Sequence, residues 1–542
     1  MQLKDALEIL EQIAFYLELK GENVFKINAF HTAIRNLSRF DVSLNDAFDK
    51  EIIQNTAGVG KTIQSILKEL REKNESSLLN ELKVQFPPEI YELTRIRGVG
   101  AKKIKKLYEE LNISSIDELE QACVENKLLK IPGFGEKTQN SILENINKLK
   151  TRKGKILLHH ADAYFANLSE ELKKIYKKKF NHTGSLRLRS RIISKIEILL
   201  IKDASQKKII DELSLKSIEE NVFVGNYNDI EINLTFTDEK RFFYDLLRTT
   251  GTDNFLQRIK FNSLKTETFE SEEEIFQKLN LPFIPPQARE NENLELRKYD
   301  FPSLDDLKGL IHIHSNYSDG SNSIKEILDY AEKKNYEYVL LCDHSKSAFY
   351  ANGLDEKRLK EQWKEIDELN SKSKNVRILK GIECDILPDG SLDFDDSILE
   401  KFDCVIASVH SKFKMTEIEM TKRIINALKN KYVKILGHPT GRLLLSRDAY
   451  PLNIDEIINV VANEGKSIEL NCNPHRLDLD WEYHQKAVSK GIKITISPDA
   501  HSFRDMEFVR YGIDMVIKGG LEKKDIVNCL SLNQFLKDFC QK

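Results

Sequence analysis

The feature that most constrains the fold lies in residues 307–542, where seven apolar runs alternate with segments long enough to be helices. The runs cover residues 310–314, 338–344, 376–383, 404–410, 433–438, 467–472 and 493–497. Short apolar runs separated by helix-length segments are typical of parallel strands joined by crossover helices. A barrel with one strand fewer than the usual eight is the simplest way to close such a series. We therefore predict a distorted (βα)7 barrel.

Histidines and acids stand at or just past the ends of these runs. They are His312, His314, Asp319, His344, Glu383, His410, His438, Asp499 and His501. Residues i and i+2 of a strand point the same way, and the carboxyl ends of barrel strands face the active site. A lone strand histidine is more often a satisfied core residue. Here, however, six of the chain's twelve histidines fall at strand ends with acids between them, and this favours a metal centre.

Nine nitrogen and oxygen ligands exceed what one ion needs, so we predict two or three divalent ions that share a bridging carboxylate. Imidazole and carboxylate suit Zn²⁺ or Mn²⁺, and the absence of cysteine ligands argues against a structural zinc site. Several metals in an open mouth can ionise a water and clamp phosphoryl oxygens, which predicts a hydrolase. His475 and His484 lie outside the ligand set. We expect them in a groove or at the surface, with His475 as a candidate substrate contact.

Residues 1–150 carry apolar residues at helical spacing and a Gly-x-Gly motif that recurs three times. The residues concerned are Gly58, Gly60 and Lys61, then Gly98, Gly100 and Lys102, then Gly133, Gly135 and Lys137. Such a turn exposes backbone N–H groups at a helix N-terminus, where they can hold a phosphate while the lysine adds charge. One copy could be an ordinary helix cap. Three copies predict helix-hairpin-helix binding of the DNA backbone by two helical domains, residues 1–80 and 81–150.

With these motifs in place, residues 307–542 resemble a PHP (polymerase and histidinol phosphatase) domain. Residues 381–390 and 469–474 resemble the subgroup fused to bacterial family X DNA polymerases (PolX). The resemblance implies three ligand sets: His312, His314, Glu383 and Asp499; Glu383, His410 and His438; and Asp319, His344 and His501. Glu383, His410 and Asp499 would surround a metal-bridged hydroxide that attacks phosphorus. Residues 20–26 resemble the family's small N-terminal domain, but Ile66 stands where lyase-active relatives have lysine, so no deoxyribose phosphate lyase activity is expected.

Residues 184–201 resemble the Gly-Ser signature of nucleotidyltransferases, in which Gly184 and Ser185 would hold a triphosphate. The two acids expected on the next strand are replaced by Lys195 and Glu197, and the third acid is at best Glu231. Two-metal phosphoryl transfer needs clustered anions, whereas an ammonium group repels Mg²⁺ and can pair with a neighbouring glutamate. We therefore predict an α+β palm and thumb over residues 151–285, with Mg²⁺ binding, dNTP binding and polymerase activity weak or lost. A linker over residues 286–306 would follow.

The palm is then expected to serve as a DNA-binding scaffold. Its basic residues are Arg187, Arg189, Arg191 and Lys195, with further lysines in residues 173–179; the alternative is a solvated helix face. In the barrel, Arg442, Arg447 and Arg476 are candidates to grip DNA phosphates, and each is equally a candidate surface ion pair. Because the net charge is only −3, any contact with DNA must come from such local patches.

These features predict a PolX-like DNA-repair protein that acts as a metal-dependent 3′→5′ exonuclease, with cutting at abasic sites and removal of 3′ phosphates as related activities. Three alternatives stay open: an active gap-filling polymerase, a small-molecule phosphatase of the histidinol-phosphatase type, and a non-catalytic DNA-binding scaffold. The seven scattered cysteines form no C-x-x-C pair, and no apolar run reaches roughly 18 residues. We accordingly expect a soluble cytoplasmic monomer that binds DNA and no membrane.

Overall fold

The computed structural model describes residues 1–40, 42–228 and 230–540. The chain divides into two compact units, residues 1–153 and 154–542. Within the described residues, no helix is both long enough and apolar enough to cross a membrane. The cysteines are unpaired, and five of the seven are buried.

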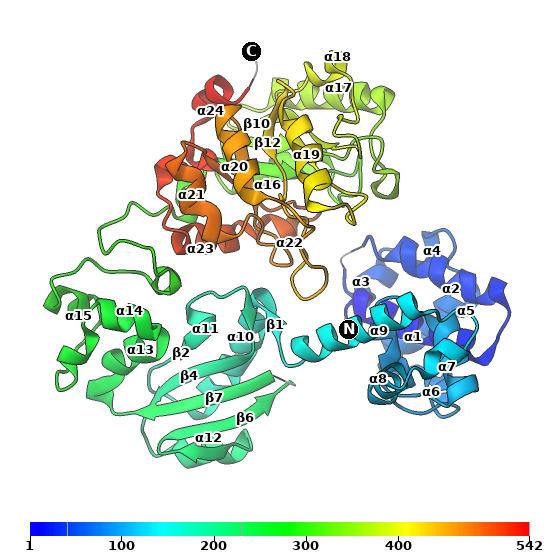
Figure 1. Cartoon of the computed structure of the whole chain (residues 1–542), viewed down its shortest axis with the longest axis horizontal. Helices are drawn as coiled ribbons and strands as arrows, with labels where there is room; N and C mark the ends of the chain where they lie inside the picture. The colour runs from blue at the N-terminus through cyan, green and yellow to red at the C-terminus, as the bar shows by residue number, and fades with distance from the viewer. Residues whose placement is uncertain (41, 229, 541–542) are drawn as a thin grey trace. The chain divides into compact units, whose positions relative to one another are not determined.

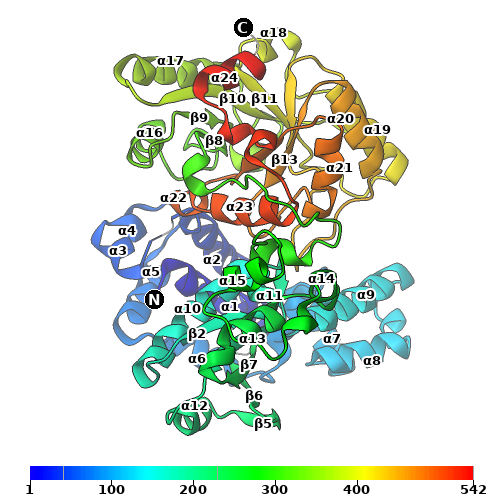
Figure 2. The same ribbon diagram turned by 90° about the vertical axis from the view of Figure 1, so that its left-hand side faces the viewer.

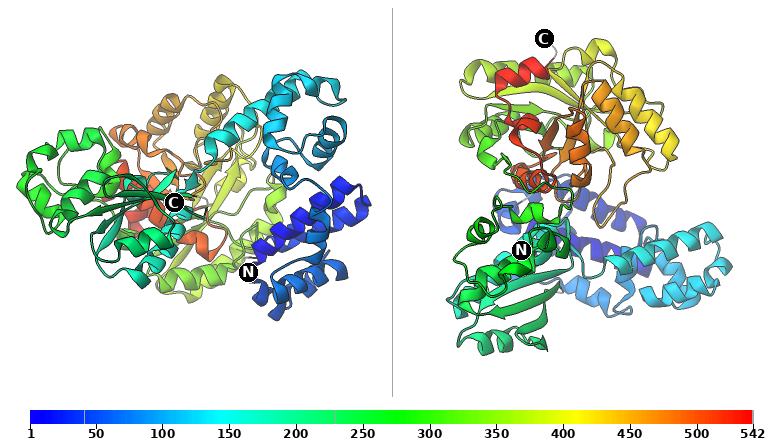
Figure 3. Two further views of the ribbon diagram at one scale, coloured as in Figure 1. Left: turned by 90° about the horizontal axis from the view of Figure 1, so that it is seen from below. Right: turned by 60° about the vertical axis from the view of Figure 1, so that its left-hand side comes forward.

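The first unit is helical, as its periodicity predicts. Its α-helices are α1 (Leu3–Lys20), α2 (Val24–Leu37), α3 (Leu44–Asp49), α4 (Ile52–Asn55), α5 (Lys61–Lys73), α6 (Ser77–Lys83), α7 (Ala101–Leu111), α8 (Ile116–Val124) and α9 (Glu136–Arg152). In α1, Leu10, Ile13 and Leu17 lie on one face of the helix, and this face is almost fully buried. Figure 3 shows these helices in blue to cyan.

The second unit begins with a five-stranded sheet in the order β2-β4-β7-β6-β5. Its strands are β2 (Phe180–Thr183), β4 (Lys195–Ile201), β5 (Lys216–Glu219), β6 (Val222–Tyr227) and β7 (Ile230–Thr237). β4 and β7 run parallel at its centre, and the other neighbours are antiparallel. Figure 1 shows β4, β7 and β6 side by side. The sheet is accompanied by α10 (Leu158–Ile175), α11 (Gly184–Arg187) and α12 (Gln206–Glu212). The sequence-based expectation of an α+β palm is confirmed.

A small helical region follows, with its own apolar core around Phe255, Phe261 and Phe276. It contains α13 (Phe242–Thr250), α14 (Asp253–Arg258) and α15 (Glu272–Lys278). The next segment, predicted to be a linker, is firmly packed: Arg289 is 1% exposed, and the Asn291 side chain donates a hydrogen bond to the Lys518 carbonyl at 2.9 Å.

The rest of the chain forms a seven-stranded parallel sheet in strictly sequential order. Its strands are β8 (Gly309–Ile313), β9 (Tyr338–Leu341), β10 (Arg377–Asp385), β11 (Cys404–Ser408), β12 (Val433–Leu436), β13 (Ser467–Asn471) and β14 (Ile494–Ser497). The ends of the sheet meet, because His314 N donates to Ala500 O at 2.9 Å and Ala500 N donates to His312 O at 3.2 Å. The predicted distorted (βα)7 barrel is confirmed.

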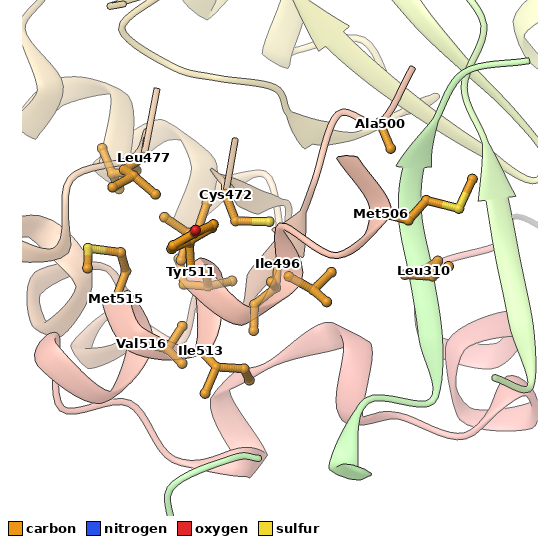
Figure 4. Packing of buried hydrophobic residues seen from close by; sticks show 14 of the residues in the cluster. Leu310, Cys472, Leu477, Ile496, Ala500, Met506, Tyr511, Ile513, Met515 and Val516 are labelled. Carbon is orange, nitrogen blue, oxygen red and sulfur yellow. The ribbon is translucent and has the colours of Figure 1, made fainter. Parts of the chain in front are cut away.

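Helices surround this barrel on the outside (Figure 2). They are α16 (Ile324–Lys333), α17 (Glu356–Lys372), α18 (Asp396–Leu399), α19 (Glu417–Leu428), α20 (Ile454–Asn463), α21 (His484–Ser489), α22 (Phe503–Met506) and α23 (Val509–Lys518). The last helix, α24 (Leu532–Asp538), differs, because its Phe535 packs with Ile311, Leu340 and Ile406 in a separate apolar cluster. Figure 4 shows Tyr511, Ile513 and Val516 of α23 gathered near Ile496 and Cys472. A Cβ on Gly512 would lie 2.3 Å from Ile496, so this close helix–strand approach requires glycine.

The arginines that follow the Gly-Ser signature are tied into ion pairs within the second unit. The pairs are Arg187 with Glu272 at 2.6 Å, Arg189 with Asp162 at 2.5 Å and with Asp514 at 2.7 Å, and Arg191 with Asp480. The prediction that these arginines form a DNA path is wrong, because carboxylates of the protein already neutralise them. Arg189 and Arg191 instead join the palm to the barrel.

Candidate metal centre

The nine predicted ligands converge at the carboxyl ends of the barrel strands. Potential ligand atoms lie within 4.8 Å of one another in three groups: His314, Asp319, His344 and His501; His312, His314, Glu383 and Asp499; and His344, Glu383 and His410. The group of His312, His314, Glu383 and Asp499 is one of the three ligand sets that the family resemblance implies. The group around Asp319 contains a second implied set, Asp319, His344 and His501, together with His314. The ninth residue, His438, places its Nε2 2.9 Å from Glu383 Oε1.

Glu383, near the end of β10, is the centre of this arrangement. Its Oε1 lies 2.9 Å from His438 Nε2 and 3.2 Å from His410 Nε2, while its Oε2 lies 2.9 Å from His344 Nδ1. The side chain is completely buried. A carboxylate that faces imidazoles on both oxygens has the position expected of a bridging ligand.

The acids of the centre are held in their charged form. Burial raises the pKa of Glu383, but His410 and His312 outweigh it and hold the pKa well below its ordinary value. Burial also opposes ionisation of Asp319, yet the hydrogen bond and charge of His501 lower its pKa to about 2. The centre therefore offers anionic oxygen ligands at neutral pH.

Several buried ring nitrogens face this centre without a hydrogen-bond partner. Among the described residues, His312 Nε2 and His314 Nδ1 are buried and unbonded. Buried polar atoms are nearly always bonded, so such an orphan calls for a bound ion or water. Imidazole nitrogens among ionised carboxylates are a donor set that fits divalent metal ions.

A second layer of polar residues orients the ligands, and sequence reasoning missed it. Glu469 Oε2 lies 2.7 Å from His312 Nδ1, and Asp385 accepts a short hydrogen bond from His410 Nδ1. Such partners fix the tautomer and orientation of a metal-binding imidazole. The only signal in the sequence was an acid inside an apolar run, Glu469 within 467–472.

Asp343 organises the loop that carries Asp319. It is fully buried in protein and accepts hydrogen bonds from Ser315 N at 2.8 Å, Ser318 N at 3.2 Å and Gln362 Nε2 at 2.6 Å. Burial raises the pKa of this carboxyl group. The hydrogen bonds fix the turn after β8, so Asp319 is presented towards His344 and His501.

Three of the nine residues have left-handed backbone conformations. The φ angles are 68° at His312, 21° at His438 and 52° at Asp499. Side chains other than glycine adopt this region at an energetic cost, and such strain concentrates at functional sites.

The three barrel arginines differ in how far they are already engaged. Arg442 donates to Asp480 and to the carbonyls of Arg476 and Leu477, so it fastens two loops together. The Arg447 guanidinium lies 4.3 Å from the centroid of the Phe413 ring. Arg476 Nε lies 3.6 Å from Asp499 Oδ2, and its buried Nη1 has no hydrogen-bond partner. Arg476 is therefore the arginine best placed to meet a phosphate at the centre.

The two additional histidines occupy different environments. His475 is exposed, and its ring lies 4.9 Å from that of His159 in α10. His484 is completely buried, and its Nε2 bonds the Leu479 carbonyl at 3.3 Å. The expectation of a groove or surface position is wrong for His484, because the ring packs against Gly519 beneath α23.

In the palm, Lys195 begins β4, where the resemblance to nucleotidyltransferases leads us to expect a metal-binding acid. Its Nζ lies 3.0 Å from Glu197 Oε1, as predicted, and the register of β4 and β7 places Glu231 opposite Lys195. Gly184 has a φ of 55°, and a Cβ there would lie 1.8 Å from Glu197 Oε2. The Glu197 carboxylate thus lies directly against the Gly-Ser turn.

The three Gly-x-Gly motifs share one backbone geometry. Gly58, Gly98 and Gly133 have φ angles of 84°, 88° and 94°. The second glycines, Gly60, Gly100 and Gly135, are the N-caps of α5, α7 and α9 without a capping side chain. The first-turn N–H groups therefore have no cap, as an anion site requires. Lys61 begins α5, and Lys102 and Lys137 are the second residues of α7 and α9.

Comparisons with known families agree with these features. Residues 1–76 match the model of a helix-hairpin-helix domain, and residues 90–148 match a SAM-like helix-hairpin-helix tandem. Residues 311–473 match the PHP domain. A probable phosphatase of Thermoanaerobacter sp. (strain X514) is 34% identical over 170 residues, which cover 30% of this chain and 67% of the phosphatase. A probable phosphatase of Acetivibrio thermocellus is 30% identical over 28% of this chain and 67% of its own length.

One relative matches along nearly the whole chain. The DNA polymerase/3′-5′ exonuclease PolX of Bacillus subtilis (strain 168) is 34% identical over 573 aligned positions, which cover 99% of this chain and 100% of the relative. This similarity includes the hairpins, the palm and the barrel together. The chain therefore belongs to the PolX family.

Proposed function

We propose that this protein is a metal-dependent 3′→5′ exonuclease of DNA repair whose catalytic centre is the PHP barrel. The observation that carries the proposal is the convergence of nine metal-type ligands, Glu383 among them, at the carboxyl ends of the barrel strands, in a chain that also has three uncapped hairpin helices. The hairpins would hold the DNA backbone. The PolX relative, which bears both activities in its name, supports the assignment.

Two or three divalent ions, Mn²⁺ or Zn²⁺, would be held by the nine residues, with Glu383 shared between them. Such ions polarise phosphoryl oxygens and lower the pKa of water. The protein's own residues then set the geometry. Glu469 and Asp385 orient His312 and His410, and Asn471 Nδ2 donates to Asp499 Oδ2 at 3.0 Å. Arg476, with its unbonded Nη1, would bind a phosphate oxygen of the substrate.

Hydrolysis of 3′-labelled and 5′-labelled DNA, single- and double-stranded, tests this function with Mn²⁺ and without dNTPs. We expect the wild-type protein to shorten strands from the 3′ end. Replacement of His312 and His314 by alanine should abolish shortening, while Glu368→Gln, at an exposed ion pair on α17, should leave it unchanged. Degradation that survives the double histidine replacement would refute the proposal.

Removal of 3′ phosphates by the same centre is a second candidate activity. The relatives that match only the barrel region are named probable phosphatases. A DNA strand ending in a 3′ phosphate should then lose phosphate at a rate that falls together with nuclease activity in the Glu383→Gln protein. The gap-filling polymerase is the less favoured alternative, because Lys195 and Glu197 pair with each other in the palm.

A further inference from the structure

Two neighbouring aromatic side chains stand in solvent on the loop after β9. Phe349 is 85% exposed and Tyr350 is 65% exposed. Their ring centroids are 6.2 Å apart with an interplanar angle of 77°. The rings therefore meet edge to face, so their own contact covers one face of only one of the two rings. Large apolar side chains of this exposure point to a binding role when they lie together at the rim of a site.

The loop that carries these rings is fixed to the metal centre. Ser347 N donates to Asp393 Oδ2 at 2.6 Å, and Ser347 Oγ donates to Asp385 Oδ2 at 2.5 Å. Asp385 is also the partner of His410. On the far side of the aromatic pair, Leu354 N donates to His344 O at 2.8 Å. Both ends of the loop are thus bonded to ligands or to their partners.

The turn itself is shaped to hold the rings outward. Ala348 and Ala351, on either side of the pair, are 0% and 1% exposed. Asn352 Nδ2 donates to the Tyr317 carbonyl at 3.1 Å. A Cβ on Gly353 would lie 2.0 Å from Ser345 O, so the turn closes too tightly for any other residue. The small residues are buried, and the large ones are presented to solvent.

The two attachments of the loop, to Asp385 and to the His344 carbonyl, place Tyr350 beside the mouth. Partial loss of solvation, together with the charges of Asp385, Glu383 and Asp319, raises the pKa of Tyr350. The rim here is rich in carboxylates, which repel phosphate groups. An uncharged aromatic face is the kind of group that can hold a nucleotide at such a rim, because every base offers a π-face.

We propose that Phe349 and Tyr350 form a stacking platform for the bases of the 3′-terminal nucleotides, so that the centre binds a 3′ end that carries bases more tightly than one that lacks them. This rests on the proposed nuclease function and deepens it. The scissile phosphate would lie at the metal ligands while the adjoining bases lie on the two rings.

A substrate comparison tests the platform. Matched oligonucleotides carry either normal bases or tetrahydrofuran abasic residues at the last two 3′ positions. We expect the wild-type kcat/KM to fall about tenfold on the abasic strand. Replacement of both Phe349 and Tyr350 by alanine should remove this difference, mainly through a higher KM on the base-bearing strand. The exchange Phe349→Tyr with Tyr350→Phe should restore it.

Binding without hydrolysis gives a second measurement. EDTA prevents hydrolysis, so binding can be followed with a strand that carries the fluorescent base 2-aminopurine at its 3′ end. The fluorescence of this base should fall when the strand binds the wild-type protein, and it should stay unchanged when the strand is mixed with the double alanine variant. The matched control is Leu304→Ala, which should resemble the wild type. Leu304 is a half-exposed apolar residue that precedes β8 in the chain. If the double alanine variant keeps both the quenching and the base dependence, the platform is refuted although the nuclease function stands. If wild-type protein cuts no DNA with Mn²⁺, the proposed function itself fails.

Discussion

Lys195 Nζ lies 3.0 Å from Glu197 Oε1, at the place where a nucleotidyltransferase would hold two Mg²⁺ ions with carboxylates. The internal ion pair satisfies Glu197 and leaves a cation at the centre of the site. Divalent ions would have to displace this cation before nucleotide chemistry could begin.

We therefore expect no measurable primer extension by the wild-type protein on gapped DNA with dNTPs and Mn²⁺. Replacing Lys195 and Glu197 by aspartate should create a site in the palm that binds Mn²⁺. Calorimetry should detect this binding in a protein that also carries His312→Ala and His314→Ala, which weaken binding at the barrel centre. Lys202→Asp, at the exposed end of the same sheet, is the matched control. Extension by the wild type that is lost in Glu197→Ala would contradict this view.

Metal stoichiometry should separate the roles of Glu383 and His501. Elemental analysis of the purified protein is expected to find two to three ions per chain. Because Glu383 faces imidazoles on both carboxylate oxygens, Glu383→Gln should lose more than one ion. His501→Ala should lose a single ion, because Asp319 is the one residue among those described whose carboxylate lies within 3.5 Å of that ring. The ring's Nδ1 contacts Asp499 through the backbone carbonyl, at 2.9 Å. Equal losses in the two variants would argue against a bridging Glu383.

The three hairpin lysines should contribute to DNA affinity through charge alone. With Lys61, Lys102 and Lys137 replaced by alanine, the slope of log affinity against log salt should become shallower by about 3. Hydrolysis of bis-p-nitrophenyl phosphate, which needs no DNA clamp, should not change. An unchanged salt slope would exclude these hairpins from the DNA interface.

Glu272 should make stability depend on acid pH. Burial raises its pKa, but Arg289 and Arg187 outweigh burial and lower the pKa from 4.5 to about 2. Because the folded pKa lies below the unfolded one, the stabilisation is complete above pH 4.5 and is lost as pH falls towards 2. It amounts to about 3 kcal/mol. Glu272→Gln should lower the melting temperature at pH 7, and its deficit relative to wild type should shrink between pH 4.5 and 2. A deficit that stays constant over this range would contradict the assignment.

The barrel and the convergence of the candidate ligands could be predicted because both depend on local pattern. The ends of the strands can be read from the ends of the apolar runs. Side chains two residues apart in a strand point the same way, so His312 and His314 face the same point. The supporting contacts could not be predicted, since their partners are remote in sequence: Arg189 and Asp514 are 325 residues apart. A run of arginines has the same sequence pattern whether DNA or the protein itself supplies the opposite charge, and this is why Arg187, Arg189 and Arg191 were assigned to a DNA path.

The ion pairs from Arg189 and Arg191 to the barrel have a consequence for how this chain can change over generations. A palm without polymerase activity would be free to shrink or disappear if it made no contact with the barrel. In this chain, its removal would leave Asp514 without its Arg189 partner and would remove one of the two arginines that pair with Asp480. The palm is therefore a structural support of the barrel whether or not it copies DNA, and deletions within it should be tolerated only where these two contacts survive.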